Sequence, residues 1–291
     1  MEHILGQDRA LAGLHQALRA ERLHHAWIFA GPAGVGKFTT ARAFAAVLLD
    51  PDAAPNLAGV IEADPHGRTA RLVEAGTHPD LHIIYKELAR YLDDRTARTR
   101  KLTTIPVDVL RQYMIGGQIG GAAGKYHEPI VSHTPREGHR KVFIIDEAEL
   151  LDLTGQNALL KTLEEPPQET YIMLVTSRPE RLLPTIRSRA QVVRFQRLDE
   201  AAMRAWVDRA GLEVGESELA WILRFAEGAP GVAVRAAEHG FFEWSERFEP
   251  LWREAASGAY ARGLGEAFAE FVASYAASWV KGDANRSKDA A

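Results

Sequence analysis

Two short stretches of the chain combine residue types and spacings that suit phosphate chemistry. The first is GPAGVGK, in which Gly31, Gly36 and Lys37 have the spacing G-x-x-x-x-G-K of a phosphate-binding loop. Glycines let backbone N–H groups point at phosphate oxygens, the start of a helix adds its dipole, and the lysine adds a positive charge. We therefore predict that Gly31, Gly34, Gly36 and Lys37 bind the phosphates of a nucleotide.

The loop departs from this pattern directly after the lysine, where Ser or Thr is expected and Phe38 stands. The missing hydroxyl normally ligates the Mg²⁺ ion that bridges the β- and γ-phosphates. Thr39 is kept among the candidate nucleotide-binding residues, but it lies about 100° further round the helix and is no simple replacement. The sequence thus allows ATP or ADP to bind, with Mg²⁺ at an impaired site, and predicts inefficient hydrolysis.

The second stretch is KVFIIDEAE, an apolar run that ends in Asp146 and Glu147. An aspartate at the end of a buried strand can hold Mg²⁺, and the glutamate after it can orient or deprotonate the attacking water. Acidic residues at the end of a strand also often cap the following helix. Because a phosphate-binding loop precedes the pair, we favour Asp146 as a nucleotide-site residue and Glu147 as a catalytic residue.

Strand and helix patterns alternate along the first two thirds of the chain. The apolar runs that predict strands lie at residues 25–31, 81–86, 141–149 and 170–177. A helical pattern at residues 39–50 follows the glycine loop, which gives the strand, loop and helix context that phosphate binding requires. Strands that are apolar throughout predict a parallel sheet covered by helices on both faces, so the expected fold class is α/β.

From Asp199 onward only helical patterns remain. Asp199 begins one helix and Ser217 is the expected N-cap of the next. Two more helices are expected within residues 242–258 and 260–280, and the polar tail at 281–291 is expected to be disordered.

Composition sets limits on the class of protein. The 291 residues are 46% hydrophobic, enough for a full core, and a formal net charge of −4 argues against a generally basic surface that coats nucleic acid. There are no cysteines, which excludes disulfides and thiolate metal sites. The chain begins with no signal peptide and has no apolar run near the ~20 residues of a membrane span, so we expect a cytoplasmic protein.

In six segments the chain resembles the delta-prime subunits of the bacterial DNA polymerase III clamp loader, which are relatives of AAA+ proteins. The segments are ILGQDRAL, HAWIFAGPAGVGK, EAGTHPDLH, KVFIIDEAELL, QNALLKTLEEPP and LVTSRPERLLPTIRSRAQ. The resemblance implies an AAA+ nucleotide-binding domain, a helical lid and a C-terminal helical collar. The corresponding divisions are residues 1–197, 198–240 and 241–280, followed by the tail at 281–291.

The resemblance also implies roles for particular residues. Ser188-Arg189-Ala190 stands where the family has Ser-Arg-Cys, so Arg189 is the candidate arginine finger, offered in trans to ATP on a neighbouring subunit. Thr176 and Ser177 match the place of the polar sensor of the γ-phosphate, and the sequence does not choose between them.

The chain departs from the family pattern in three further ways. The segment between the phosphate loop and the second strand lacks the four zinc-binding cysteines of many relatives and offers only His66, so we predict no zinc. Val232 stands where active subunits have a nucleotide-sensing arginine, and Arg235 follows too late to be assigned that role. Only about fifty residues follow the lid, fewer than the collar of larger relatives.

These observations favour a clamp-loader subunit that helps to place the sliding clamp on primed DNA during replication and stimulates a neighbouring ATPase subunit. Its implied partners are other loader subunits, the clamp and primer-template DNA. The alternatives are an autonomous AAA+ ATPase, either a loader motor subunit or a branch-migration type, and a free-standing nucleotide-sensing adaptor. A basic segment at residues 90–101 either contacts DNA phosphates or is a solvated loop, and we favour the latter.

Overall fold

The computed structural model describes residues 4–20, 23–56, 59–94, 102–120, 124–137, 140–258 and 261–289. The chain divides into two compact units, Met1–Pro32 with Gly36–Gln196 and Ala33–Val35 with Arg197–Ala291. Each unit is described by itself. The finer division into an α/β domain, a lid and a collar-like region stays a prediction.

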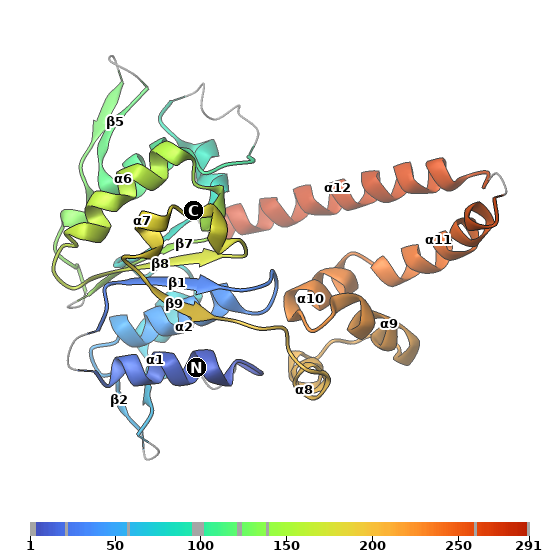
Figure 1. The fold of residues 1–291 in the computed structure, drawn as a ribbon, viewed down its shortest axis with the longest axis horizontal. Coiled ribbons are helices and arrows are strands. Elements are labelled where there is room, and N and C mark those ends of the chain that lie inside the picture. The colour runs from blue at the N-terminus through green and yellow to red at the C-terminus, as the bar shows by residue number, and fades with distance from the viewer. Residues whose placement is uncertain are drawn as a thin grey trace. The chain divides into compact units, whose positions relative to one another are not determined.

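A five-stranded parallel sheet forms the centre of the first unit (Figure 1). The strands lie in the order β4-β7-β8-β1-β9. Their bounds are β1 (Ala26–Ala30), β4 (Leu81–Ile84), β7 (Lys141–Ile145), β8 (Thr170–Thr176) and β9 (Gln191–Arg194). Helices lie on both sides of this sheet in the ribbon, so the predicted α/β fold class is confirmed.

The four predicted strands are all present, and β9 is a fifth that the apolar runs did not reveal. This strand lies at the edge of the sheet, and of its four residues only Val193 is buried. A strand with one buried residue has no apolar run, so a search for strands buried on both faces passes over it.

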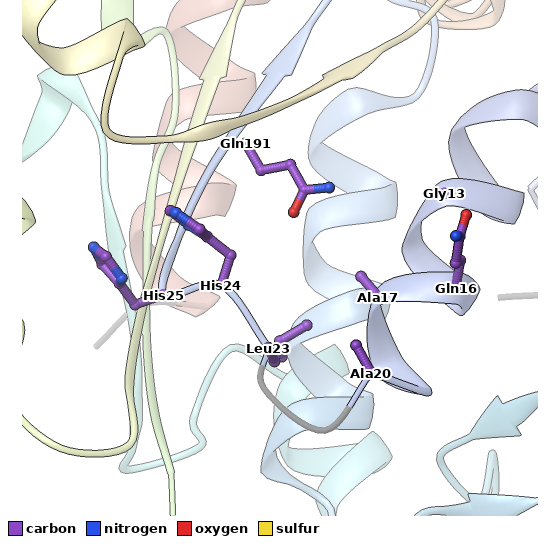
Figure 2. A pocket seen from close by; sticks show the side chains of 8 residues that line it. All are labelled: Gly13, Gln16, Ala17, Ala20, Leu23, His24, His25 and Gln191. Atoms are coloured by element: carbon purple, nitrogen blue, oxygen red, sulfur yellow. The ribbon is translucent and has the colours of Figure 1, made fainter.

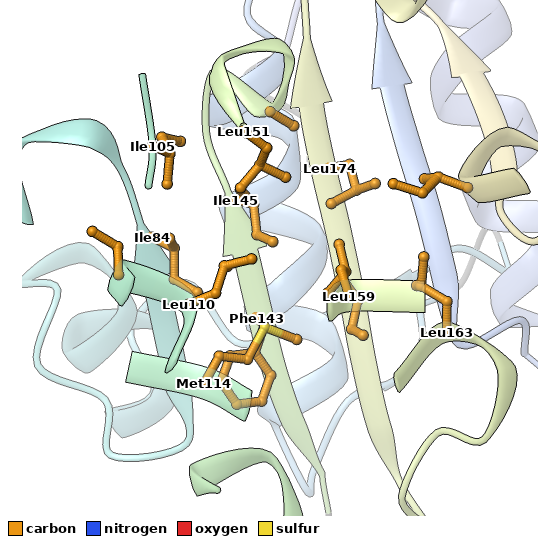
Figure 3. Packing of buried hydrophobic residues seen from close by; sticks show 14 of the residues in the cluster. Ile84, Ile105, Leu110, Met114, Phe143, Ile145, Leu151, Leu159, Leu163 and Leu174 are labelled. Atoms are coloured by element: carbon orange, nitrogen blue, oxygen red, sulfur yellow. The ribbon is translucent and has the colours of Figure 1, made fainter. Parts of the chain in front are cut away.

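Alternate side chains of β1 pack on opposite faces of the sheet. Trp27 and Phe29 lie against Phe44 of α2 (Lys37–Leu49), with ring centroids 5.4 and 6.4 Å apart. Ile28 joins a cluster on the other face, which Figure 3 shows in part. That cluster includes Leu159 from α6 (Leu153–Glu164), so both faces of the strand are covered by helices.

Shorter elements connect the strands of the first unit. The helices are α1 (Asp8–Leu18), α3 (Arg68–Glu74), α5 (Val107–Leu110) and α7 (Pro184–Arg187), the 3-10 turns are η1 (Lys86–Tyr91), η4 (Ile130–Ser132), η5 (Ala148–Leu150) and η6 (Pro179–Arg181), and η2 (Arg111–Ile115) is a π turn. Two antiparallel hairpins are formed by β2 (Ala54–Pro55) with β3 (Ile61–Glu62) and by β5 (Gly117–Ile119) with β6 (Lys125–His127).

The glycine-rich segment GGQIGGAAGKYHEP at residues 116–129 contains the two paired strands β5 and β6 on either side of residues outside the described ranges. In the basic segment at 90–101, Arg95, Arg98, Arg100 and Lys101 also lie outside the described residues.

The buried side chain of Gln7 pairs with the backbone that follows the edge strand β9. Its Nε2 donates to Gln196 O at 2.7 Å, and Gln196 N donates to Gln7 Oε1 at 3.1 Å. One side-chain amide thus satisfies both backbone groups of a residue directly beyond the strand.

The second unit is helical. Its helices are α8 (Glu200–Ala210), α9 (Glu216–Ala226), α10 (Pro230–Glu238), α11 (Phe241–Ala256) and α12 (Leu264–Asp289). Asp199 caps α8 as predicted, since its carboxylate accepts from Ala202 N at 2.8 Å. Aromatic rings join the last two helices, and the ring of Phe271 lies 5.3 Å from that of Trp244.

One expectation for this unit is wrong. Helix α9 begins at Glu216 with Gly215 as its N-cap, so Ser217 lies inside the first turn rather than at the cap. Helix α12 has the bounds Leu264–Asp289, and the disorder expected for residues 281–291 stays a prediction.

We expect Gly31→Ala to destabilise the first unit by about 2 kcal/mol. A Cβ at Gly31 would lie 2.5 Å from Phe195 O, and the backbone there is held by the Phe195 N to Ala30 O hydrogen bond at 2.8 Å. Gly13→Ala is the matched control, because a Cβ there meets nothing within 4 Å and α1 gains a better helix former, worth about 0.5–1 kcal/mol. Urea unfolding of both variants measures the difference, and equal midpoints would contradict the close approach.

Candidate functional site

The candidate site lies at the carboxyl edge of the parallel sheet. In the register of the strands Ala30 pairs with Thr176 and Ile145 pairs with Leu174. The residues that follow these strands therefore leave the sheet at the same edge, where ligands bind in open α/β sheets. The glycine loop and the two sequence-predicted segments after β7 and β8 thus meet there.

The glycine loop ends at the first residue of α2. Gly36 is the N-cap and has φ of 92°, in the left-handed region that favours glycine. Lys37 is the first residue of the helix. The first backbone N–H groups of a helix lack partners within it. In this chain those groups stand at the end of the glycine loop, because α2 begins there.

Lys37 is buried, and its ammonium group contacts the loop that precedes it. Nζ donates to Gly31 O at 2.8 Å and to Pro32 O at 2.5 Å, and it lies 3.3 Å from Ser177 Oγ. Burial lowers the pKa of Lys37, and the negative charges of Glu149 and Asp146 act in the opposite sense. The cation is thus held at the edge of the sheet by carbonyl dipoles and two carboxyl groups.

No hydroxyl in the described first turn of α2 takes the place of the one that Phe38 removes. Thr39 is exposed. Thr40 is fully buried, and its Oγ1 donates to Gly36 O at 2.8 Å within its own helix. The exposure of Thr39 agrees with the expectation that it is no simple replacement for the missing hydroxyl. Neither threonine therefore offers Mg²⁺ the ligand that a Ser or Thr at position 38 would provide.

Asp146 directly follows β7. Burial raises the pKa of this carboxyl group to about 6, although the backbone N–H of Glu147 donates to its Oδ1 at 2.9 Å. The neighbouring charges of Glu147 and Glu149 raise the pKa further, whereas that of Lys37 lowers it. A carboxyl group in this environment exchanges a proton near neutral pH and would bind a cation best at higher pH.

Glu147 forms an ion pair with a lysine that follows another strand of the sheet. Its backbone has φ of 48° in the left-handed region, and its Oε2 lies 2.6 Å from Lys86 Nζ. Lys86 follows β4, the strand adjacent to β7. The sequence did not single out Lys86, because only the sheet order places it beside the acidic pair.

Glu149 is a site residue that sequence reasoning missed. Its Oε1 accepts from Ser177 N at 3.1 Å, and its buried Oε2 has no hydrogen-bond partner among the described residues. Its charge acts on Lys37 more strongly than that of Asp146 does. The acidic run DEAE held the signal, but the spacing of Glu149 matches no familiar motif.

The two candidate sensor residues have different surroundings. The buried Thr176 has its Oγ1 occupied as an acceptor from Arg178 N at 3.1 Å. Ser177 Oγ instead faces the ammonium group of Lys37. The hydroxyl of Ser177 thus lies at the end of the glycine loop, whereas that of Thr176 contacts the backbone of the turn that follows β8.

Arg189 lies apart from this edge cluster, on the turn after α7, where its guanidinium contacts its own chain. NH1 donates to Thr185 O at 3.0 Å, and NH2 lies 2.8 Å from Glu164 Oε1. The role of Arg189 as an arginine finger stays a prediction.

The segment that leads to Arg189 is anchored by the buried Gln156 of α6. Gln156 Nε2 donates to Leu151 O at 3.2 Å and to Arg181 O at 3.3 Å, and its Oε1 accepts from Leu183 N at 2.8 Å. These bonds fix the chain just before α7. Gln156 lies in the quoted QNALLKTLEEPP segment but was not recognised as a positioning residue.

In the second unit, Val232 lies against a residue of the glycine loop. A Cβ at Gly34 would be 3.2 Å from Val232 N, and Gly231 N donates to Gly34 O at 2.8 Å. Gly34 itself has φ of 77°. Arg235 is exposed one turn further along α10, and the loss of a sensing arginine at position 232 stays a prediction.

A separate pocket of about 600 Å³ opens at the opposite edge of the sheet (Figure 2). It is lined in part by His24 and His25, which precede β1, and by Gln191 at the start of β9. The two imidazole rings stack at 4.7 Å. Because β1 runs away from this pocket toward the glycine loop, the pocket is no part of the candidate phosphate site.

Within the described ranges, no three His, Asp or Glu side chains are grouped to hold a metal ion, and the prediction of no zinc stays a prediction. None of the helices in that part of the chain has the length and apolar character to cross a bilayer.

The parallel sheet, the glycine loop before α2 and the acidic residues after β7 define the class of proteins that have an α/β domain with a phosphate-binding loop. Within this class the family described as "DNA polymerase III, delta subunit" matches residues 6–199. The chain belongs to that family.

Curated relatives agree with this assignment. The DNA polymerase III subunit delta' of Pseudomonas aeruginosa is 33% identical over 220 residues, which cover 75% of this chain and 57% of that protein. The subunit gamma/tau of Mycobacterium tuberculosis is 31% identical over 231 residues, which cover 78% of this chain and 34% of that protein. The chain thus matches between a third and little more than half of the length of these relatives.

The solved structures that match this chain are more distant in sequence. A RuvB variant from Thermotoga maritima is 14% identical with a TM-score of 0.46, covering 92% of this chain and 87% of that one. A gamma subunit-related protein of DNA polymerase III from the same organism is 16% identical with a TM-score of 0.40, covering 91% and 77%.

We expect Asp146→Asn to stabilise the protein at pH 8 by about 2 to 3 kcal/mol. The folded pKa of about 6 exceeds the ordinary value of 3.8, so folding disfavours the ionised carboxylate. The wild type therefore loses stability as the pH rises through this window, and the gain of the variant vanishes below about pH 4. Urea unfolding of both proteins between pH 4 and 8 measures this, and a difference independent of pH would contradict it.

We expect Gln156→Ala to lower the free energy of unfolding by about 2 to 4 kcal/mol, because it leaves buried backbone groups without partners. Asn157→Ala is the matched control, since Asn157 is exposed and makes one bond, to Leu153 O of its own helix at 2.9 Å. The control should change stability by less than about 0.5 kcal/mol. Chemical denaturation compares the two, and an equally small change in both would contradict the anchoring role of Gln156.

Proposed function

We propose that this chain is a delta-prime-like subunit of a clamp loader, which helps to place a sliding clamp on primed DNA and supplies Arg189 to ATP on a neighbouring subunit. Membership of the DNA polymerase III delta subunit family supports this proposal. Its partners are other loader subunits, the clamp and primer-template DNA, and it acts in the cytoplasm.

The observation that carries the proposal is the pairing of Glu147 with Lys86 in a site that already lacks the hydroxyl at position 38. A glutamate that lies 2.6 Å from a lysine must leave this ion pair before it can deprotonate water. With the metal ligand also missing, this chain's own site hydrolyses ATP poorly.

Nucleotide binding survives in this proposal. Lys37 and the N–H groups at the start of α2 fit the phosphates of ATP or ADP, and Ser177 lies at the position to contact them. A bound nucleotide would take the lysine from its contacts with Gly31 O and Pro32 O. Asp146 would help to hold the Mg²⁺ ion that accompanies the nucleotide, and the ion would supply positive charge to the phosphates.

Arg189 suits action in trans because its guanidinium group is partly exposed and contacts only groups next to its own turn among those described. Guanidinium binds phosphate oxygens through paired N–H donors and stays charged at all relevant pH values. Offered to a neighbour, it would stabilise charge that develops during phosphoryl transfer.

The rival function is an autonomous ATPase, which the complete set of Lys37, Asp146 and Glu147 favours. Relatives named gamma/tau are as similar to this chain as those named delta'. The rival requires that Lys86 release Glu147 and that Mg²⁺ bind without the hydroxyl.

The deciding experiment is DNA-stimulated ATP turnover by the chain reconstituted with its cognate loader subunits and clamp. We expect Arg189→Ala to lower turnover at least about tenfold, because an arginine finger contributes on the order of 10³ or more to its own site. Lys37→Ala should leave turnover within about twofold, because the site it damages contributes little.

Arg187→Ala is the control for loss of charge, since Arg187 is exposed and is the last residue of α7, the short helix that precedes Arg189. It should behave like the wild type. A large loss in Lys37→Ala with none in Arg189→Ala would establish the autonomous ATPase instead.

A further inference from the structure

The guanidinium group of Arg189 is already paired with a carboxylate of its own chain. NH2 lies 2.8 Å from Glu164 Oε1, and NH1 donates to Thr185 O at 3.0 Å. The side chains of Arg189 and Glu164 are 37% and 49% exposed, so the pair faces solvent. A phosphate that approaches Arg189 would meet a cation whose charge is partly offset.

Glu164 occupies a position where a carboxylate does not stabilise its own helix. It is the last residue of α6, where the negative end of the helix dipole disfavours negative charge. Glu165, the next residue, has the same charge at the same helix end, and its carboxylate forms no ion pair or hydrogen bond with the described residues. Arg189 offsets the first of these carboxylates and leaves the second to solvent.

We propose that Glu164 is a positioning residue that pairs with Arg189 until a nucleotide on the neighbouring subunit is present. The guanidinium group then exchanges the Glu164 carboxylate for the phosphates of that nucleotide. The proposal rests on the proposed function of Arg189 as a group that acts in trans. Ion pairs with this degree of exposure are weak, whereas a desolvated contact between arginine and phosphate is stronger. The exchange of one anion for the other is therefore favourable only when a nucleotide is presented.

The bond from Arg189 to Thr185 O does not involve the negative charge. It can keep the side chain directed along the same turn while the carboxylate leaves. Glu164 thus sets how available the guanidinium is, and the backbone of α7 sets where it lies.

The first test uses the isolated chain and phenylglyoxal, which reacts at the nitrogen atoms of the guanidine group. Since the Glu164 carboxylate lies 2.8 Å from NH2 of Arg189, Glu164→Gln should free this nitrogen and raise the rate of modification at Arg189 about two- to fivefold, as read by mass spectrometry of peptides. Glu165→Gln is the matched control and should leave this rate unchanged, because it removes the same charge from the same helix end without touching Arg189. Equal rates in the wild type and both variants would overturn the proposal.

The second test uses the loader reconstituted with its clamp and DNA. Glu164→Gln should lower the KM for ATP about two- to fivefold with kcat unchanged, because a competitor for the arginine has been removed. Glu165→Gln should match the wild type. An unchanged KM, or a fall in kcat such as a misfolded turn would produce, would overturn the proposal.

The two tests separate this inference from the proposed function. If Arg189→Ala leaves turnover intact, the trans role of Arg189 fails, while the rate of modification still reports whether Glu164 holds the guanidinium. If Arg189→Ala abolishes turnover and Glu164→Gln changes neither the rate nor the KM, only the inference about Glu164 fails.

Discussion

The arrangement of the candidate site depends on the burial of one positive charge. Removing an ammonium group from water is costly unless other groups replace its hydration, so the groups around Lys37 are constrained to be polar. Two carbonyl oxygens of the glycine loop and the hydroxyl of Ser177 surround it, and two carboxyl groups act on it from the strand end after β7. These groups come from three strands of the sheet, and only parallel strands bring their carboxyl ends to one edge.

The three carboxyl groups after β7 show how one short acidic run can have three different environments. Asp146 is half-buried, and desolvation raises its pKa to about 6. Glu147 turns outward to an ion pair with Lys86, and Glu149 turns inward to Ser177 N. The left-handed conformation of Glu147 separates these directions, because it turns the chain sharply within three residues. The chemistry available to each group follows from this turn.

Much of this could be predicted from the sequence, because local patterns specified it. Four buried strands and the glycine loop were found since apolar runs and glycine spacing are local signals. The contact of Lys86 with Glu147 was not predictable, because it depends on β4 lying beside β7. Strand β9 has too few buried residues to give a run, and the choice of Gly215 over Ser217 as a cap depended on where the turn before α9 ends.

The pairing of Gln7 with Gln196 has a consequence for how the sheet ends. An edge strand offers its free N–H and C=O groups as a template on which another chain can add by hydrogen bonding. Just beyond β9, the amide of Gln7 already takes both the donor and the acceptor of one backbone residue. A strand that paired with the backbone at Gln196 would have to displace the buried side chain of Gln7. The amide therefore opposes the addition of another strand beyond this edge.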